Sequence, residues 1–146
     1  MARAVLDTSV LVSALLTPEG VPGQLLDQAE EGTFVLCISP AILDEARRVL
    51  LREPKLQARY RYSAASVETF CEGLLAFADL VAELPELPGA VPLDPKDDMI
   101  IATAVAGRAD YLVTGDRRHL IVLEHYEGIR ILSPRAFLSE LAPDQA

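Results

Sequence analysis

The chain has 146 residues, of which 51% are apolar and 24% charged, and these proportions predict one globular domain covering residues 1–146. A domain of this length buries roughly 68 to 70% of its unfolded surface, so it needs neither a metal nor a disulfide for stability. Cys37 and Cys71 lack the spacing of a zinc site and are expected to be reduced, buried thiols. No segment approaches the roughly 18 uncharged apolar residues of a membrane span, and we expect a cytoplasmic protein.

The charge is acidic overall but unevenly distributed. Thirteen Lys and Arg against 22 Asp and Glu give a net charge of −9, which by itself disfavours a nucleic-acid partner. Between Ala46 and Tyr62, however, Glu53 is the one acid among six bases, which are Arg47, Arg48, Arg52, Lys55, Arg59 and Arg61. Such a basic helix on an acidic body suits a polyanion, an acidic partner protein, or simply exposure to solvent.

The first half of the chain predicts strands alternating with helices. A continuous apolar run at 2–6 indicates a buried strand, and the apolar run at 10–16 indicates a helix capped by Thr8 or Ser9. A helix beginning at Pro22 and ended by Gly32 precedes a second buried strand at 34–38. Ser39-Pro40 starts a third helix, which Pro54 is expected to stop.

The second half continues the alternation. Apolar residues at steps of three and four predict a longer helix from Ser63 to about Val81. Prolines make 84–95 a loop, with a short strand near 80–83 as one option. A helix at 97–106, strands at 111–113 and 129–132, and a final helix from Pro134 complete the pattern. The whole predicts an α/β fold, a three-layer α/β/α sandwich around a mostly parallel twisted sheet.

Acidic residues fall where such a sheet binds ligands. Asp7 and Asp116 each follow a predicted strand, and ligands bind beyond the carboxyl ends of parallel strands. In the third helix, Glu45 borders the apolar stripe while Asp44 points to solvent. Asp97 and Asp98 stand at the start of the predicted helix at 97–106. Each acid alone is explained by a turn, a cap or an ion pair such as Glu45 with Arg48, but their joint placement favours a site.

Several carboxylates in one cleft repel each other unless a cation neutralises them. Oxygen ligands without His or Cys select a hard ion, Mg²⁺ or Mn²⁺, which also accepts phosphate oxygens. Such an ion polarises a phosphodiester and activates a bound water. The pattern therefore predicts hydrolysis of a nucleic-acid backbone.

At this point the sequence resembles the PIN-domain nucleases, and specifically the VapC-like toxins of prokaryotic toxin–antitoxin pairs. The matching segments occur in family order over nearly the whole chain, and they are 5–12 (VLDTSVLV), 39–45 (SPAILDE), 97–104 (DDMIIATA) and 111–116 (YLVTGD). The resemblance implies a twisted parallel sheet between helices, a pocket that binds Mg²⁺ or Mn²⁺, and endonucleolytic cleavage of RNA. It also implies an antitoxin that blocks the pocket and a homodimer.

Carried over by motif, the resemblance implies that the catalytic and metal-binding acids are Asp7, Glu45, Asp98 and Asp116. Ser9 and Thr114 would be supporting hydroxyls, and Asp97 could share or take the role of Asp98. Many relatives carry Asn where this chain has Ser9, so contacts near the metal differ there. From the helix angles alone, Arg48 and Arg52 beside Glu45 would suit RNA phosphates.

Two other functional classes are alternatives to a nuclease. A phosphatase of the haloacid dehalogenase type needs a second Asp two residues after the first, and position 9 is serine. The more serious alternative is a non-catalytic module that binds protein or RNA through the basic helix Arg47–Arg61, with the acids only capping helices. The RNA target, the antitoxin and the number of metal ions are left open by the sequence.

Overall fold

The computed structural model describes residues 1–85, 95–115 and 124–142, with the backbone alone for residues 95–97. Six strands form one sheet in the order β3-β2-β1-β4-β6-β5. Five of them are parallel and β5 pairs antiparallel with β6. The strands are β1 (Arg3–Leu6), β2 (Val35–Ile38), β3 (Asp79–Leu80), β4 (Tyr111–Val113), β5 (His125–Tyr126) and β6 (Ile129–Leu132).

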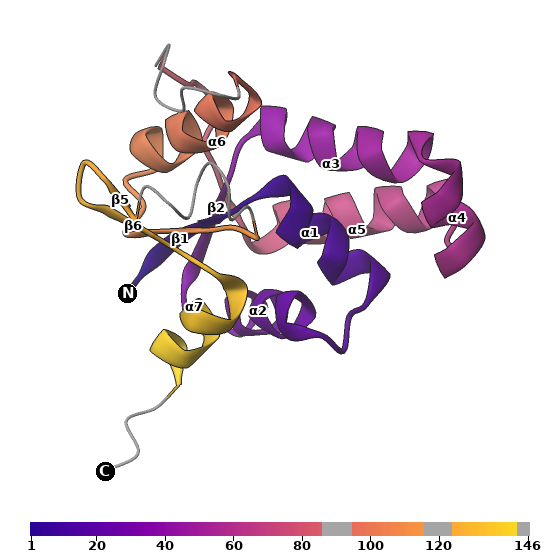
Figure 1. Cartoon of the computed structure of the whole chain (residues 1–146), viewed down its shortest axis with the longest axis horizontal. Helices are drawn as coiled ribbons and strands as arrows, with labels where there is room; N and C mark the ends of the chain where they lie inside the picture. The colour runs from indigo at the N-terminus through magenta and orange to yellow at the C-terminus, as the bar shows by residue number, and fades with distance from the viewer. Residues whose placement is uncertain (86–94, 116–123, 143–146) are drawn as a thin grey trace.

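Helices lie on both sides of this sheet, which confirms the predicted α/β sandwich (Figure 1). In Figure 1, α6 lies above the sheet and contacts β1, β2 and β4, whereas α2 and α7 lie together below it. The pairs α1 and α3, and α3 and α5, pack against each other at the side. The helices are α1 (Thr8–Leu16), α2 (Val21–Glu30), α3 (Pro40–Arg52), α4 (Pro54–Tyr60), α5 (Ala64–Phe77), α6 (Pro95–Ala106) and α7 (Pro134–Leu141).

The core is formed by the central strands and the helix faces that cover them. Consecutive residues of β1 are buried, as are those of β2 and β4, because both faces of a parallel sheet are covered by helices. At the lower face, the ring of Phe137 packs edge-to-face on Phe34, with centroids 5.1 Å apart. Cys37 and Cys71 are free and buried, as predicted, and burial raises the pKa of both thiols.

Three local predictions were wrong, and a fourth was correct but incomplete. Pro54 does not only stop α3 but also begins α4, because proline fits the first turn of a helix. The helix predicted to reach Val81 ends at Phe77, since Asp79 and Leu80 pair with β2. The short strand is therefore at 79–80 and not 80–83. Asp7, not Thr8 or Ser9, occupies the N-cap position of α1.

The edge strand β5 was not predicted from the sequence. It is two residues long and joins β6 through a tight turn at Glu127 and Gly128, whose φ angles are 46° and 83°. Positive φ at both central residues is the geometry that suits a two-residue hairpin. The predicted loop at 84–95 lies mostly outside the described residues. Within the described part of the chain, no helix is long and apolar enough to cross a membrane.

Two helical glycines differ sharply in the space around them, which gives a matched pair of substitutions. A Cβ at buried Gly23 of α2 would lie 1.9 Å from the carbonyl oxygen of Pro18, whereas a Cβ at exposed Gly73 of α5 meets nothing within 4 Å. We expect Gly23→Ala to destabilise the fold because α2 must move away from Pro18. Gly73→Ala should stabilise it by about 0.8 to 1 kcal/mol. Urea unfolding measures both, and equal effects would contradict the close packing at Gly23.

Candidate active site

The site lies where the strand order of the sheet reverses. β1 is flanked by β2 on one side and β4 on the other, and ligands bind at such switch points beyond the strand carboxyl ends. Leu6 pairs with Val113, and the amide of Asp7 donates to the carbonyl of Val113 at 2.9 Å. The side chain of Asp7 is thereby held beside Thr114, the residue that follows β4.

The carboxylate of Asp7 is buried and hydrogen-bonded. The residue is 8% exposed, and the fully buried Thr114 donates its hydroxyl to Asp7 Oδ2 at 2.6 Å. Asp7 occupies the N-cap position of α1, but its side chain makes no capping bond. Its backbone carbonyl accepts instead from Val10 and Leu11. A capping role therefore does not account for this acid.

The second acid comes from α3. Ser39 caps that helix by accepting from the amide of Ile42, as the Ser-Pro pair predicted. The side chain of Glu45 is 21% exposed, whereas that of its neighbour Asp44 is 73% exposed. This confirms the predicted orientation of the two acids. Glu45 also forms the ion pair with Arg48 that the sequence offered as its ordinary explanation.

A buried chain of hydroxyls joins α3 to α6. Thr103 donates to the carbonyl of Met99 at 2.9 Å, so the Ser39 hydroxyl, 2.8 Å from that of Thr103, is the donor of the bond between them. Ser39 and Thr103 are both fully buried. The link fixes the start of α3 against α6, and so sets Glu45 relative to the residues near Asp98. Sequence reasoning identified Ser39 only as a cap, because the partner is 64 residues away.

The structure describes the other predicted acids only in part. Asp98 is half-buried on α6, and the two residues that follow it line the cavity described next. Nothing is described of the Asp97 side chain. Asp116 lies outside the described residues. The structure therefore brings Asp7 and Glu45 together, with Asp98 adjoining, and the convergence of all four acids stays a prediction.

A cavity of about 470 Å³ is lined by both Asp7 and Glu45. Its polar part is formed by the start of α1 with Glu45, and its apolar part by later residues of α1, α3 and α4. The Thr8 hydroxyl is buried there and has no hydrogen-bond partner among the described residues. The lining residues are Asp7, Thr8, Ser9, Val12, Ser13, Leu16, Glu45, Val49, Leu56, Met99 and Ile100.

The donors in this cavity suit a hard cation. Two carboxylates and the hydroxyls of Thr8, Ser9 and Ser13 supply oxygen alone, which is the ligand type that Mg²⁺ and Mn²⁺ prefer. Across the described residues, no three His, Cys, Asp or Glu side chains lie close enough to hold a metal ion. Mg²⁺ is usually held by one or two carboxylates together with waters and substrate phosphates, so the two carboxylates of this cavity suit such an ion.

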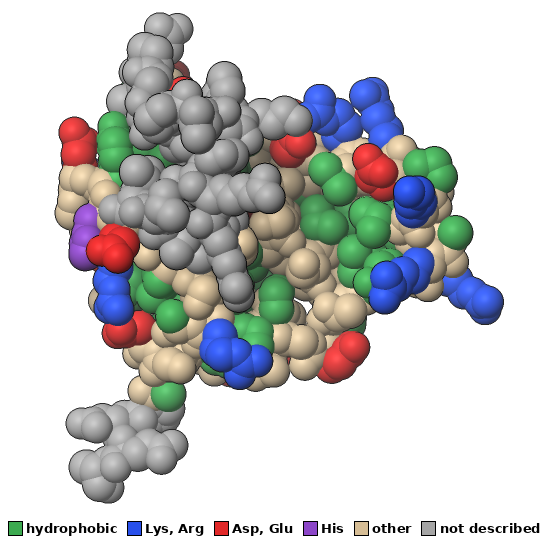
Figure 2. All heavy atoms as spheres, in the orientation of Figure 1, with side chains coloured by type: hydrophobic (Ala, Val, Ile, Leu, Met, Phe, Trp, Pro, Cys, Tyr) green, Lys and Arg blue, Asp and Glu red, His purple; other side chains and the backbone are tan. Residues whose placement is uncertain are grey.

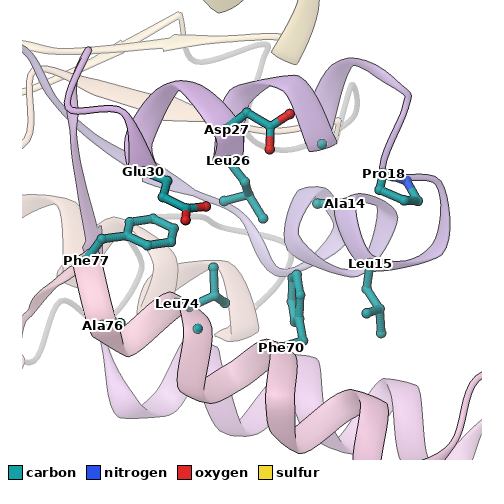
Figure 3. A pocket seen from close by; sticks show the side chains of 12 residues that line it. Ala14, Leu15, Pro18, Leu26, Asp27, Glu30, Phe70, Leu74, Ala76 and Phe77 are labelled. Carbon is teal, nitrogen blue, oxygen red and sulfur yellow. The ribbon is translucent and has the colours of Figure 1, made fainter.

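A second cavity, of about 610 Å³, lies between α1, α2 and α5 (Figure 3). Leu26 of α2 faces Phe70 and Leu74 of α5 across it, and Asp27 and Glu30 lie on its α2 side. Ala14 and Leu15 of α1 line this cavity, while Val12 and Ser13 line the acidic one. Helix α1 thus separates the two, and most of the side chains that line the second cavity are apolar.

Comparison with known proteins fits this geometry. The family model described as "PIN domain" matches residues 3–118. This chain is a member of the PIN domain family. Proteins of the family are generally nucleases, and the matched region contains Asp7, α1 and α3, which carry the cavity's polar residues.

Individual relatives support the same assignment of the fold. This PIN domain is 29% identical to the Methanocaldococcus jannaschii protein MJ1680, over 94% of this chain and 90% of that one. Its structure is similar to PAE2754 from Pyrobaculum aerophilum (TM-score 0.62, 18% identity, 96% and 89% covered). It is also similar to a chain of VapBC2 from Rickettsia felis, solved bound to a promoter DNA fragment (TM-score 0.60, 14% identity, 90% and 98% covered).

The link between α3 and α6 can be tested through stability. Thr103→Val keeps the shape of the side chain but leaves the buried Ser39 hydroxyl without its acceptor. We expect a loss of about 1 to 3 kcal/mol in the free energy of unfolding. Thr33→Val, at an exposed position, is the control and should change it by less than about 0.5 kcal/mol. A Thr103→Val protein as stable as the control would show that the link contributes little.

Proposed function

We propose that this PIN domain is a metal-dependent endoribonuclease and the toxin of a toxin–antitoxin pair. The observation that carries the proposal is that Asp7, from the end of β1, and Glu45, from α3, line one cavity at the switch point of the sheet. These are two of the acids that the family resemblance assigns to catalysis. An RNA substrate also accords with the predicted cytoplasmic location.

The proposed cofactor is Mg²⁺ or Mn²⁺. Asp7, Glu45 and Asp98 would hold it, together with Asp116, which lies outside the described residues. When bound, such an ion neutralises the acids, polarises the phosphodiester and lowers the pKa of a coordinated water. Membership of the PIN domain family and the oxygen donors of the cavity support this choice of ion.

The protein's own groups have distinct proposed roles. The Thr114 hydroxyl donates to Asp7 Oδ2, which fixes the carboxylate and directs its other oxygen away from Thr114. Ser9 is exposed at the cavity and is proposed as a supporting hydroxyl, with Asp97 as a further supporting acid. Arg48 is held beside the cavity by its ion pair with Glu45 and, with Arg52, is proposed to contact RNA phosphates.

The proposed partners are an antitoxin protein and a second copy of the chain. Support for an antitoxin comes from the structural likeness to VapBC2, which was solved bound to a fragment of promoter DNA. In this proposal the antitoxin blocks the acidic cavity. The homodimer follows from the family resemblance.

The alternative is a module that binds RNA or protein through Arg47–Arg61 without catalysis. One observation favours it, because Arg52, Lys55, Arg59 and Arg61 are exposed and form no ion pair among the described residues. The two functions differ in one measurable respect. Only the nuclease needs the carboxylates of Asp7 and Glu45 for its effect on RNA.

Cleavage of single-stranded RNA with Mg²⁺ or Mn²⁺ tests the nuclease. We expect Asp7→Asn and Glu45→Gln to reduce kcat by at least about a hundredfold, because electrostatic stabilisation of this kind contributes several kcal/mol. Asp44→Asn is the matched control, since it removes an adjacent but exposed carboxylate from the same helix and should cleave normally. EDTA should abolish cleavage. Equal cleavage by Asp7→Asn and wild type would refute the proposal.

Thermal unfolding tests the metal site independently of activity. A divalent ion that binds the folded state alone stabilises it by about 2.7 kcal/mol at roughly 100 times its Kd, so Mg²⁺ or Mn²⁺ should raise the Tm by several degrees. Asp98→Asn should raise the Tm of the metal-free protein by relieving repulsion between acids and should reduce the increase caused by metal. If millimolar metal leaves the wild-type Tm unchanged, the acids do not converge.

A further inference from the structure

We propose that α4 is a docking arm for single-stranded RNA, which holds the strand beside the scissile phosphate through Lys55 and Arg59 and stacks a base on Tyr60. The inference rests on the proposed nuclease function and extends it to the form of the substrate. It starts from α4, which is a helix separate from α3, and from a set of cations that form no ion pair among the described residues.

The acidic cavity reaches α4. Its lining passes from Asp7 and Glu45 to Leu16, Val49 and Leu56. Leu16 ends α1 and Leu56 belongs to α4, and the eight steps from Thr8 to Leu16 correspond to about 12 Å of helix. The cavity is therefore elongated, with the acids at one end and α4 at the other. A strand cut at the acids and lying along this cavity would leave it over α4.

The cations of α3 and α4 divide into two groups. Arg47 is paired with Asp44 and Glu68, and Arg48 with Glu45. Within the described ranges, no ion pair is formed by the bases nearer the α4 end, which are Arg52, Lys55, Arg59 and Arg61. All four of these residues are exposed. An arm whose charges are not neutralised internally attracts an anion.

Figure 2 shows this distribution on one face of the molecule. Lys and Arg side chains gather over α3 and α4, beside hydrophobic side chains that lie between these helices and α1. Leu56 and Arg59 are three residues apart on α4, so they lie on the same side of the helix. An apolar surface next to cations suits the bases and phosphates of an unpaired strand.

Tyr60 gives the arm an aromatic surface. The guanidinium of Arg59 lies 5.4 Å from the centroid of the Tyr60 ring, and Tyr60 is half-buried at the end of α4. Proteins that bind single strands without sequence preference combine basic grooves with aromatic rings on which bases stack. Bases of a duplex are already stacked, so this feature selects unpaired RNA.

The arm is held firmly against α3. Gln57 donates to the carbonyl of Leu51 at 2.8 Å, and the Tyr62 hydroxyl donates to that of Leu50 at 2.5 Å. Both acceptors belong to the last turn of α3, whose carbonyls have no partners within the helix. Burial raises the pKa of Tyr62. These bonds fix the angle between α3 and α4, so the cations keep their position relative to the acids.

The test measures binding and cleavage separately. The Kd for fluorescent oligouridylate is measured by anisotropy in EDTA, where cleavage is absent, over a range of salt concentrations. We expect Lys55→Gln and Arg59→Gln each to weaken binding several-fold and to reduce the slope of log K against log salt by about 0.7, the value for one phosphate contact on a single strand. With metal present, KM should rise while kcat stays unchanged.

The aromatic contact has its own pair of variants. Tyr60→Ala should weaken binding of the single strand by about tenfold, because stacking is lost, and should remove the preference over a duplex of equal length. Tyr60→Phe keeps the ring and should bind normally. Arg108→Gln is the charge control, since Arg108 is exposed and precedes β4 at the opposite, amino-terminal edge of the sheet.

The outcomes distinguish this inference from the proposed function. If wild type cleaves RNA but the α4 variants match Arg108→Gln in Kd and KM, the docking arm is refuted and the nuclease stands. If wild type cleaves nothing yet the α4 variants lose RNA affinity, the arm stands and the nuclease fails. A third outcome is that all α4 variants bind RNA like wild type but no longer bind an acidic protein. This result would assign the arm to a protein partner and overturn the inference.

Discussion

A buried carboxylate at the carboxyl end of the central strand is the constraint on which the rest of this structure depends. Removing an ionised group from water is costly unless hydrogen bonds or a counter-charge offset it. Asp7 is 8% exposed and accepts the hydroxyl of the fully buried Thr114. That bond requires β1 and β4 to be neighbours in parallel register. The fold thus keeps an acid in a place where a cation would stabilise it.

The surrounding helices are fixed by bonds that cross between elements. Ser39 and Thr103 join α3 to α6 through buried hydroxyls, and Gln57 and Tyr62 join the segment around α4 to α3. Together they relate the acids at one end of the cavity to the cations at the other. This arrangement explains how a protein with a net charge of −9 can present a local surface for a polyanion, because the acids elsewhere suppress nonspecific attraction.

The order of strands and helices was predictable because burial on both faces makes parallel strands continuously apolar. The strand at Ile129–Leu132 and the helix from Pro134 were predicted at their observed starts. Prediction failed where the conformation of a segment depends on the element that packs beside it. Asp79 and Leu80 became a strand because β2 offered a free edge, and His125 and Tyr126 became one because β6 did. Proline is compatible both with the end of one helix and with the first turn of the next. At Pro54 a new helix begins, and Gln57 of that helix donates a hydrogen bond to α3.

For the site, the sequence by itself determined which acids are candidates for the chemistry. A strand ending in Asp7 and a helix with Glu45 beside its apolar stripe follow from local periodicity, which also separated Glu45 from Asp44. Only the tertiary structure decided that β1 and β4 adjoin, that Thr103 reaches Ser39, and that the cavity extends to Leu56. These contacts join residues far apart in the chain, and local periodicity specifies which face of an element is buried but not the element against which it packs.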